Sequence, residues 1–512
     1  MTDRIDNIKL KITENEDKLV SIAQKKLGKA PKFFRIIKKS LDARDKGNIC
    51  WVYSIAFSDD SEQPDQPLEK LKNPPEVAII GSGPAGLFCA LRLIDRGFKP
   101  IIIERGGKVE DRKVCVEQFF KTHKLNENCN VQFGEGGAGT FSDGKLNTQT
   151  HDGLNKDVLK LFHKFGAPEE ILYLNKPHIG SDILYDVLKN IRAYIEANGG
   201  RYLFNTKFKG FTQKDGKIKT IILENTLNKQ TGELPIDCAV AALGHSARDT
   251  FRMLANEGIQ MGAREFAIGV RIEHLASDIG LAQYGKSYVN LPAADYKLVS
   301  HAHERTVFTF CMCPGGVVIP SSSEEGGVVT NGMSLYARNG ENSNSALMVQ
   351  MKKEDFGADD LFAGMRFQQN IERLAYKAGG ANYCAPVQLY KDFAKDKVSS
   401  GFGEVKPTYG IGTNFAPLGE ILPEITVEAL KAAIPDMNKR LKGFACPDAI
   451  LTGVETRFSS PVKIIRGESG ESVSLQGFYP CGEGSGYSGG ITSSAADGLG
   501  TAEKIYKKFK NH

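Results

Sequence analysis

Long apolar runs are missing from this chain of 512 residues. A membrane-spanning helix needs roughly 18–20 consecutive apolar residues, and no stretch of the sequence approaches that length. Residues 1–4 open a charged segment, whereas a signal peptide would continue into an apolar core. We therefore expect a cytoplasmic protein that has no membrane partner.

A cysteine framework is also missing. The ten cysteines are scattered from Cys50 to Cys481, and only Cys311 and Cys313 are closely spaced. A dense framework would predict disulfides, and a second close pair or a histidine cluster would predict zinc. We therefore expect reduced thiols and no metal site, with Cys311 and Cys313 in a buried strand. A redox role for this pair stays open.

Charge of one sign is not in large excess, because the formal net charge is +5. Residues 1–50 nevertheless hold thirteen basic and seven acidic residues, so the basic charge is concentrated near the N-terminus. Clustered cations attract polyanions, which makes nucleic acid an alternative partner, but a solvated surface is the interpretation we favour. The cations concerned are Lys25, Lys26, Lys29, Lys32, Arg35, Lys38 and Lys39.

Glycine, in contrast, is abundant. The chain holds 54 glycines, about a tenth of its residues against a usual ~7%. The excess gathers in a few loops, which is typical of backbone that turns tightly or approaches a ligand. Cofactor-binding loops are therefore expected.

The order of strand-like, helical and polar segments predicts an α/β protein with several domains. Residues 1–58 read as a small N-terminal α+β module and residues 59–75 as a polar linker. We expect residues 76–257 and 454–512 to form the two parts of a Rossmann-like domain. We expect residues 258–453 to form an inserted, mixed α+β substrate domain.

A glycine-rich loop follows the apolar strand predicted over residues 76–80 and opens a predicted helix. In a dinucleotide-binding unit, Gly81 permits the tight turn, Gly83 lets the backbone approach the pyrophosphate, and Gly86 allows close helix packing. Glu104 ends the second strand, where an acidic side chain accepts hydrogen bonds from adenosine ribose and repels the 2′-phosphate of NADP. We place the following Arg105 in the same site. The loop reads Gly81-Ser82-Gly83-Pro84-Ala85-Gly86.

Three later glycine-rich segments follow this unit in a fixed order. Together they resemble the FAD-binding half of the glutathione-reductase-like flavoprotein superfamily. Residues 134–146 resemble the loop beneath the flavin, and residues 241–245 resemble the strand-end Ala-Thr-Gly element, with leucine in place of threonine. Residues 479–486 resemble the C-terminal Gly-Asp element, with Glu483 in place of aspartate.

This resemblance implies a Rossmann-like FAD-binding domain. Glu483 would reach a ribityl hydroxyl, and the amides at the start of the last helix would face the flavin pyrimidine edge. The implied FAD contacts beyond the first unit are Gly137, Gly139, Thr140, Phe141, Ser142, Lys145, Leu146, Gly244, Gly482, Glu483, Gly489, Gly490 and Ile491.

Nearly the whole chain is similar to a bacterial family of uncharacterised FAD-dependent (NAD(FAD)-utilising) dehydrogenases. This similarity implies a cofactor and leaves the substrate open. A second strand–GxGxxG–helix unit and a Cys-x4-Cys motif after the first unit are both missing, which argues against a disulfide reductase. NAD(P)H would then bind only transiently, as an electron donor. The matching stretches are residues 39–44, 139–146, 244–249, 311–316 and 453–457.

Four residues are candidates for catalysis. Cys481 would bring a thiol near the flavin, although a buried strand residue is the interpretation we favour. His245, with an ordinary pKa of about 6.5, is either a proton donor or a cap on the strand end. Arg457 either binds an anionic substrate or lies on the exposed surface. Tyr487 would stack on or near the flavin.

We therefore expect an FAD-dependent oxidoreductase, a dehydrogenase or reductase that moves a hydride between flavin N5 and an organic small molecule. The substrate would bind between the FAD domain and the inserted domain. One alternative is a flavoprotein that binds or modifies nucleic acid through its basic N-terminal module. Another is a non-catalytic, redox-sensing flavoprotein.

Overall fold

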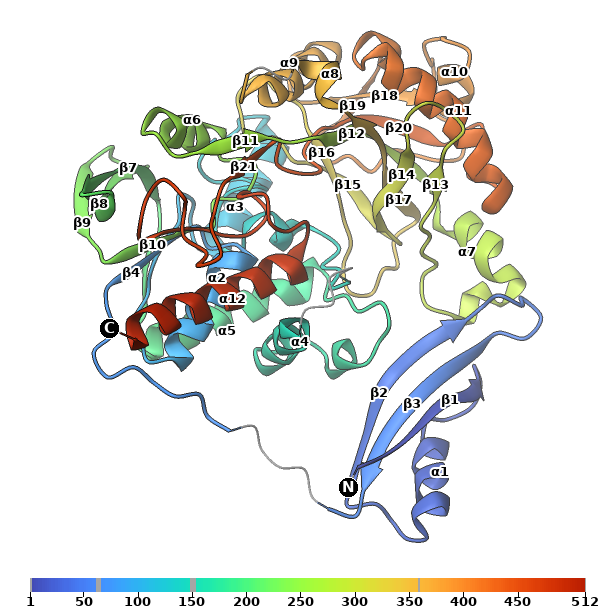
Figure 1. Ribbon diagram of the computed structural model, residues 1–512. Coiled ribbons are helices and arrows are strands. Elements are labelled where there is room, and N and C mark those ends of the chain that lie inside the picture. Colours follow the sequence, from blue (N-terminus) through green and yellow to red (C-terminus); the bar gives the residue numbers. More distant parts are fainter. Residues whose placement is uncertain (1, 61–65, 148–152, 358–359, 512) are drawn as a thin grey trace.

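The computed structural model describes residues 2–60, 66–147, 153–357 and 360–511. The predicted linker 59–75 is described only in part, because residues 61–65 lie outside these ranges. Figure 1 shows a small N-terminal sheet, a parallel sheet packed against helices, and a larger sheet, which has seven strands. Within the described ranges, every helix falls short of the length and apolarity that crossing a membrane requires.

The N-terminal residues form an antiparallel sheet in the order β1-β3-β2, and one helix packs against it. Leu19 and Ala23 of this helix are fully buried against Ile55 and Phe57 of the central strand. The elements are β1 (Asp3–Lys11), α1 (Asp17–Leu27), β2 (Phe33–Asp42) and β3 (Cys50–Ser58). Lys39 of β2 donates its N–H to the Tyr173 carbonyl at 2.8 Å, so the sheet edge contacts the next region.

A five-stranded parallel sheet, in the order β22-β10-β4-β5-β6, lies at the centre of the second region. Its central strands are short, apolar and buried, as expected for a sheet that is covered on both faces. The strands are β4 (Val77–Ile80), β5 (Ile101–Ile103), β6 (Arg201–Leu203), β10 (Cys238–Ala241) and β22 (Phe478–Pro480). The predicted α/β class with a parallel sheet is confirmed.

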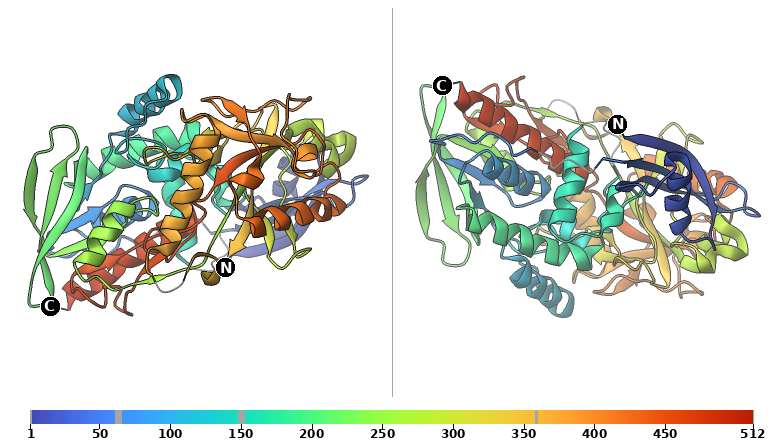
Figure 2. Two further views of the ribbon diagram at one scale, coloured as in Figure 1. Left: turned by 90° about the horizontal axis from the view of Figure 1, so that it is seen from above. Right: turned by 90° about the horizontal axis from the view of Figure 1, so that it is seen from below.

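Alternate residues of β4 face two different layers. Val77 and Ile79 pack against the helices α2 (Pro84–Asp95), α5 (Ser181–Ala197) and α12 (Ile491–Lys510). Ala78 and Ile80 pack against the opposite layer. This opposite layer comprises β7 (Thr206–Lys214), β8 (Lys217–Asn225), β9 (Thr231–Pro235) and α6 (Arg248–Asn256). In Figure 2 its β7–β9 sheet lies at the end of the molecule where the C-terminus is found.

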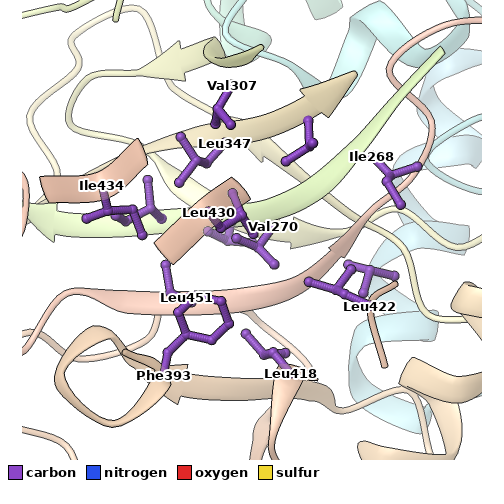
Figure 3. Close-up of a cluster of buried hydrophobic side chains, with 14 of the residues drawn as sticks. Ile268, Val270, Val307, Leu347, Phe393, Leu418, Leu422, Leu430, Ile434 and Leu451 are labelled. Atoms are coloured by element: carbon purple, nitrogen blue, oxygen red, sulfur yellow. The ribbon is translucent and has the colours of Figure 1, made fainter. Parts of the chain in front are cut away.

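The seven-stranded sheet is formed by chain segments that lie between β10 and β22, in the order β13-β14-β17-β12-β20-β18-β19. Alternation along β12 places Ile268 and Val270 on one face and Arg271 on the other. Figure 3 shows the apolar face, where Leu430 and Ile434 of α11 (Glu424–Arg440) pack on the strands. The strands are β12 (Phe266–Leu275), β13 (Val299–Ser300), β14 (Val307–Cys313), β17 (Asn342–Met351), β18 (Ala385–Leu389), β19 (Thr413–Phe415) and β20 (Ile450–Glu455).

Smaller elements connect the two large sheets. The hairpin β15–β16 and the antiparallel pair β11–β21 are both two-stranded. Their bounds, with those of the remaining helices, are α3 (Val109–Thr122), α4 (Leu154–Lys164), β11 (Met261–Ala263), α7 (Ala276–Tyr284), β15 (Val317–Pro320), β16 (Thr330–Met333), α8 (Lys353–Phe356), α9 (Ala363–Ala378), α10 (Tyr390–Phe393) and β21 (Val462–Ile464).

Candidate functional site

The loop after β4 turns where a side chain would clash. Gly81 has a φ of +105°, and a Cβ atom on it would lie 2.2 Å from the carbonyl oxygen of Ala242. A Cβ atom on Gly86 would lie 2.0 Å from the carbonyl oxygen of Gly81. The start of α2 is therefore held close to β4 and β10. Its N-terminus presents backbone N–H groups at the edge of the sheet.

Two distant segments lie against this loop. A Cβ atom on Gly137 would lie 3.0 Å from Cα of Gly83, the N-cap of α2. A Cβ atom on Gly139 would lie 3.2 Å from Cγ1 of Ile491, the first residue of α12. The glycine-rich segment 134–146 therefore runs between the starts of α2 and α12.

The ends of β10 and β22 complete the same edge. A Cβ atom on Gly484 would lie 2.4 Å from the carbonyl oxygen of Gly244. A Cβ atom on Gly482 would lie 2.7 Å from Cβ of Ala85. All the segments that the sequence assigns to FAD thus meet at the carboxyl ends of the parallel strands, where α/β sheets bind their ligands.

Space remains along this edge. Within the described part of the chain, a Cβ atom added to Gly244, Gly489 or Gly490 would have no heavy atom within 4 Å beyond its chain neighbours. Gly490 is also the N-cap of α12, a helix of 20 residues. Two helix N-termini and a glycine-lined edge suit a cofactor with a pyrophosphate and a flat ring. The residues present therefore fit FAD.

Glu104 follows β5 and joins two loops of the site. Its Oε2 accepts hydrogen bonds from the N–H and Oγ of Ser82, at 3.1 and 2.6 Å. Its Oε1 accepts from the N–H groups of Gly106 and Gly134, each at 3.0 Å. Glu104 is only 5% exposed, so its hydrogen bonds hold the glycine-rich loop 81–86 in place from the buried side. A contact with adenosine ribose stays a prediction.

Arg105 links the strand edge to α6. Its guanidinium forms an ion pair with Asp249 at 3.0 Å and donates to Thr250 Oγ1 at 3.2 Å. The same group lies 4.2 Å from the centre of the Phe133 ring. Its predicted place at the cofactor stays a prediction.

A buried arginine that sequence reasoning missed shapes the glycine-rich segment. Arg112 of α3 is fully buried and donates to the carbonyls of Asn130, Val131 and Glu135 at 2.9, 2.8 and 2.7 Å. It also donates to Thr140 Oγ1 at 3.0 Å. Burial lowers the pKa of Arg112 to about 10. Nothing in the local sequence distinguishes it from a surface arginine of an amphipathic helix.

Phe141 and Ser142 lie in the tight turn of the same segment. Ser142 Oγ donates to the Gly139 carbonyl at 2.7 Å and accepts from the Gly144 N–H at 3.1 Å. The Phe141 ring lies 4.9 Å from the Arg112 guanidinium. These contacts fix the backbone that the sequence places beneath the flavin.

The segment ends against two neighbours. Lys145 Nζ donates to the carbonyl oxygen of Met312, in β14 of the seven-stranded sheet. The carbonyl of Leu146 accepts from Thr492 Oγ1, in the first turn of α12, at 2.8 Å. Lys145 therefore lies where the parallel-sheet region meets the seven-stranded sheet.

Two predicted site residues that are 238 positions apart meet at this edge. His245 Nδ1 lies 3.1 Å from Glu483 Oε1. His245 Nε2 is buried and has no hydrogen-bond partner among the described residues. If the neutral ring donates from Nδ1, Nε2 is left as an acceptor. The predicted contact of Glu483 with a ribityl hydroxyl stays a prediction.

Arg457 is buried, so the alternative of an exposed surface arginine is wrong. It donates to both carboxylate oxygens of Glu372, at 3.2 and 3.0 Å, and to Ser246 Oγ at 3.0 Å. Arg248 binds the same carboxylate at 2.9 Å. Although burial alone would raise the pKa of Glu372, the two guanidinium groups lower it well below its ordinary range. Arg457 therefore has an internal partner.

Cys481 is a core residue. Its side chain is fully buried in the cluster beneath α12 and accepts a hydrogen bond from Thr501 Oγ1 at 3.4 Å. Burial raises the pKa of the thiol well above its ordinary value. The favoured interpretation of Cys481 as a buried residue is confirmed, although it lies one position beyond the end of β22 rather than in the strand.

Residues 463–466 hold the side chain of Tyr487 in place. Its hydroxyl donates to the Ile464 carbonyl and accepts from the Arg466 N–H, each at 3.0 Å. The guanidinium of Arg466 lies 3.7 Å from the ring centre, and Lys463 Nζ lies 4.4 Å from it. A stacking role at the flavin stays a prediction.

The basic N-terminal cluster is partly neutralised within the module. Lys29 pairs with Asp59, and Lys39 pairs with Glu16, each at 2.5 Å. Lys39 Nζ also lies 4.6 Å from the centre of the Trp51 ring. These contacts give two of the seven cations a role within the fold.

Comparison with family models assigns three parts of the chain. Residues 76–112 match an FAD binding domain. Residues 265–458 match the family described as FAD-dependent protein, C-terminal domain-like. Residues 2–58 match a domain of unknown function, DUF8436. The first match covers the glycine loop and Glu104, and it confirms FAD as the cofactor.

Whole proteins are also similar to this chain. An uncharacterised protein of Clostridium beijerinckii is 45% identical over 535 positions, which cover 99% of each chain. The structure of a flavin-dependent brominase Bmp2 triple mutant is 12% identical, covering 86% of this chain and 81% of its own, with a TM-score of 0.39. The glycerol-3-phosphate dehydrogenase of Bacillus halodurans, complexed with FAD, is 12% identical over 86% of this chain and 66% of its own, with a TM-score of 0.38. The chain belongs to the same family as the C. beijerinckii protein, and it is an FAD-binding flavoprotein.

Proposed function

We propose that this flavoprotein is an oxidoreductase, a dehydrogenase or reductase that moves a hydride between flavin N5 and an organic substrate. The observation that carries the proposal is the meeting of four glycine-rich segments and two helix N-termini at one sheet edge. When bound, FAD supplies the hydride chemistry.

The chain would hold each part of FAD with a different segment. The N–H groups at the start of α2, around Gly83, would bind the pyrophosphate, and Glu104 would accept from the adenosine ribose. Residues 137–146 would lie beneath the flavin. The amides at the start of α12, at Gly490 and Ile491, would stabilise negative charge on the reduced ring, whereas the Gly489 N–H donates to Ser493 Oγ at 3.2 Å.

The substrate would bind where the two large sheets meet. The contact of Lys145 with Met312 and the ion pair of Asp143 with Arg338 make this junction polar on both sides. Clefts between domains are common places for small ligands. We propose that residues 258–453 form a substrate domain inserted between the two parts of the FAD domain.

His245 is the residue we propose for proton transfer. Glu483 holds Nδ1, and the buried Nε2 lacks a partner among the described residues, so a proton could be taken up or released there. General acid–base catalysis contributes about 10²–10⁴-fold to a rate. His245→Gln should therefore slow substrate-dependent flavin reduction by about 10²-fold or more and leave FAD bound.

The proposal is tested by the anaerobic absorbance of the flavin in the purified protein. NADH, NADPH and a panel of alcohols, amines and hydroxy acids are added separately. Bleaching by a nicotinamide supports a reductase, and bleaching by an organic donor supports a dehydrogenase. If none of them reduces the flavin, the oxidoreductase proposal fails and a non-catalytic flavin is favoured.

A further inference from the structure

Cys311 and Cys313 form a thiol pair that the proposed function does not use. The two residues end β14 with one residue between them, and Cys313 Sγ lies 3.3 Å from the carbonyl oxygen of Cys311. Because the two cysteines are near neighbours in the chain, a disulfide between them needs no movement of distant chain segments.

An irregularity in the sheet brings these thiols together. Phe310 pairs with Ala346 and Cys313 with Asn344, so β14 holds one extra residue against β17. Cys311 has a φ of +41°, which is uncommon for a residue other than glycine. β-bulges are over-represented next to active sites, where they redirect side chains. The strained position is therefore consistent with a functional role for the pair.

A fully buried arginine contacts the same pair of cysteines. Arg271 Nη2 donates to the Cys311 carbonyl at 3.0 Å and lies 3.5 Å from Cys313 Sγ. A neighbouring cation favours the thiolate, which is the nucleophile of thiol–disulfide chemistry. Against the effect of burial, contact with Cys311 and the charge of Arg271 lower the pKa of Cys313 to about 6. The pKa of Cys311 is raised, chiefly by its contact with Cys313. The thiolate is thus favoured at Cys313 over Cys311.

The pair lies beside the glycine-rich segment 134–146, which the proposed function places beneath the flavin. Met312, the residue between the two cysteines, accepts a hydrogen bond from Lys145 of the glycine-rich segment. Cys311 is partly exposed, whereas Cys89, Cys238 and Cys481 are fully buried in apolar cores.

We infer that Cys311 and Cys313 are a redox-active dithiol that exchanges two electrons with the bound FAD, an inference that rests on the proposed oxidoreductase function. On oxidation, the Cys311 S–H bond breaks and one Sγ–Sγ bond forms between Cys311 and the Cys313 thiolate. The two electrons and the one proton convert FAD to the anionic reduced flavin, FADH−. In the reverse direction, FADH− returns the two electrons and the proton and restores the thiolate and the thiol.

The first measurement is an anaerobic titration of the oxidised holoprotein with dithionite. The wild-type protein should take up about four electrons per FAD, two for the flavin and two for the disulfide. Cys311→Ser and Cys313→Ser should each take up about two. Uptake of about two electrons by the wild-type protein would overturn the inference and leave the proposed function intact, because dithionite replaces the unknown donor.

The second measurement needs no variant. The oxidised wild-type protein is denatured, alkylated and digested. The mass of the peptide that holds both cysteines is then measured by mass spectrometry. Unalkylated Cys311 and Cys313 joined as a disulfide support the inference, and two alkylated thiols contradict it.

Cys115→Ser is the matched control, because Cys115 and Cys129 are a second pair of described cysteines whose thiol pKa values are shifted in opposite directions by their mutual contact. This variant should keep the uptake of about four electrons. If Cys115→Ser lowers the uptake to about two and Cys311→Ser does not, the redox pair lies elsewhere and the inference is wrong.

Discussion

The parallel sheet and the seven-stranded region depend on different interactions: close backbone packing in the first and buried ion pairs in the second. At the edge of the parallel sheet, positions such as Gly81 and Gly86 have no room for a Cβ atom. In the seven-stranded region, charged groups are buried in pairs, as for Arg271 with Glu455 and Arg457 with Glu372. The first kind of site depends on backbone shape and the second on charge balance. The two kinds should therefore respond differently to substitution and to pH.

Removing a buried charge should have the largest effect. Glu372→Gln leaves Arg248 and Arg457 without their shared carboxylate and should lower the free energy of unfolding by about 3–5 kcal/mol. Because the pKa of Glu372 is depressed in the folded protein, its contribution is present at neutral pH and is lost as pH falls below 4.5. Denaturant unfolding at pH 7 and at pH 4 measures both effects.

The control is Glu324→Gln, since Glu324 binds the same Arg248 at 2.7 Å but its side chain is 27% exposed. The free energy of unfolding should fall clearly less in this variant than in Glu372→Gln. Equal losses for the two variants would show that burial does not set the value of these ion pairs.

Adding one methyl group at the edge of the parallel sheet should come next. Gly81→Ala places a Cβ atom against the Ala242 carbonyl at a left-handed backbone position and should cost roughly 2–4 kcal/mol. Bound FAD should fall far below that of the wild-type protein, as measured by flavin released on denaturation. Gly232→Ala, where a Cβ atom meets nothing within 4 Å, should keep both stability and FAD.

Glu455 should show the smallest effect, as a change of pH dependence. Burial raises its pKa to about 7 despite the nearby Arg271. The folded protein then binds the proton more tightly than the unfolded chain, so stability falls as pH rises from about 4.5 to 7. Glu455→Gln should remove roughly 1–3 kcal/mol of this fall. The exposed Glu468→Gln should keep the wild-type slope, and an unchanged slope for Glu455→Gln would contradict the assignment.

The same contrast explains what the sequence could predict. A short apolar run predicts a strand over residues 76–80, and β4 spans Val77–Ile80. The loop at Gly81 was equally visible, because a tight turn and close packing impose glycine locally. In both cases the signal lies within a short stretch of chain.

Partners that come from distant segments leave no such signal. His245 and Glu483 are 238 positions apart, and Glu372 and Arg457 are 85 apart. The exposed surface was a wrong alternative for Arg457, because nothing near it in sequence indicates a buried carboxylate. Arg112 was missed for the same reason, since its partners are carbonyl oxygens of a later loop.

The most direct test is a crystal structure of the protein with FAD bound. We predict the pyrophosphate at the N-terminus of α2 beside Gly83, and the flavin between residues 137–146 and the start of α12. We also predict that His245 Nε2 faces the junction between the two large sheets. FAD bound away from this edge, or a protein that fails to bind FAD after reconstitution, would contradict these predictions.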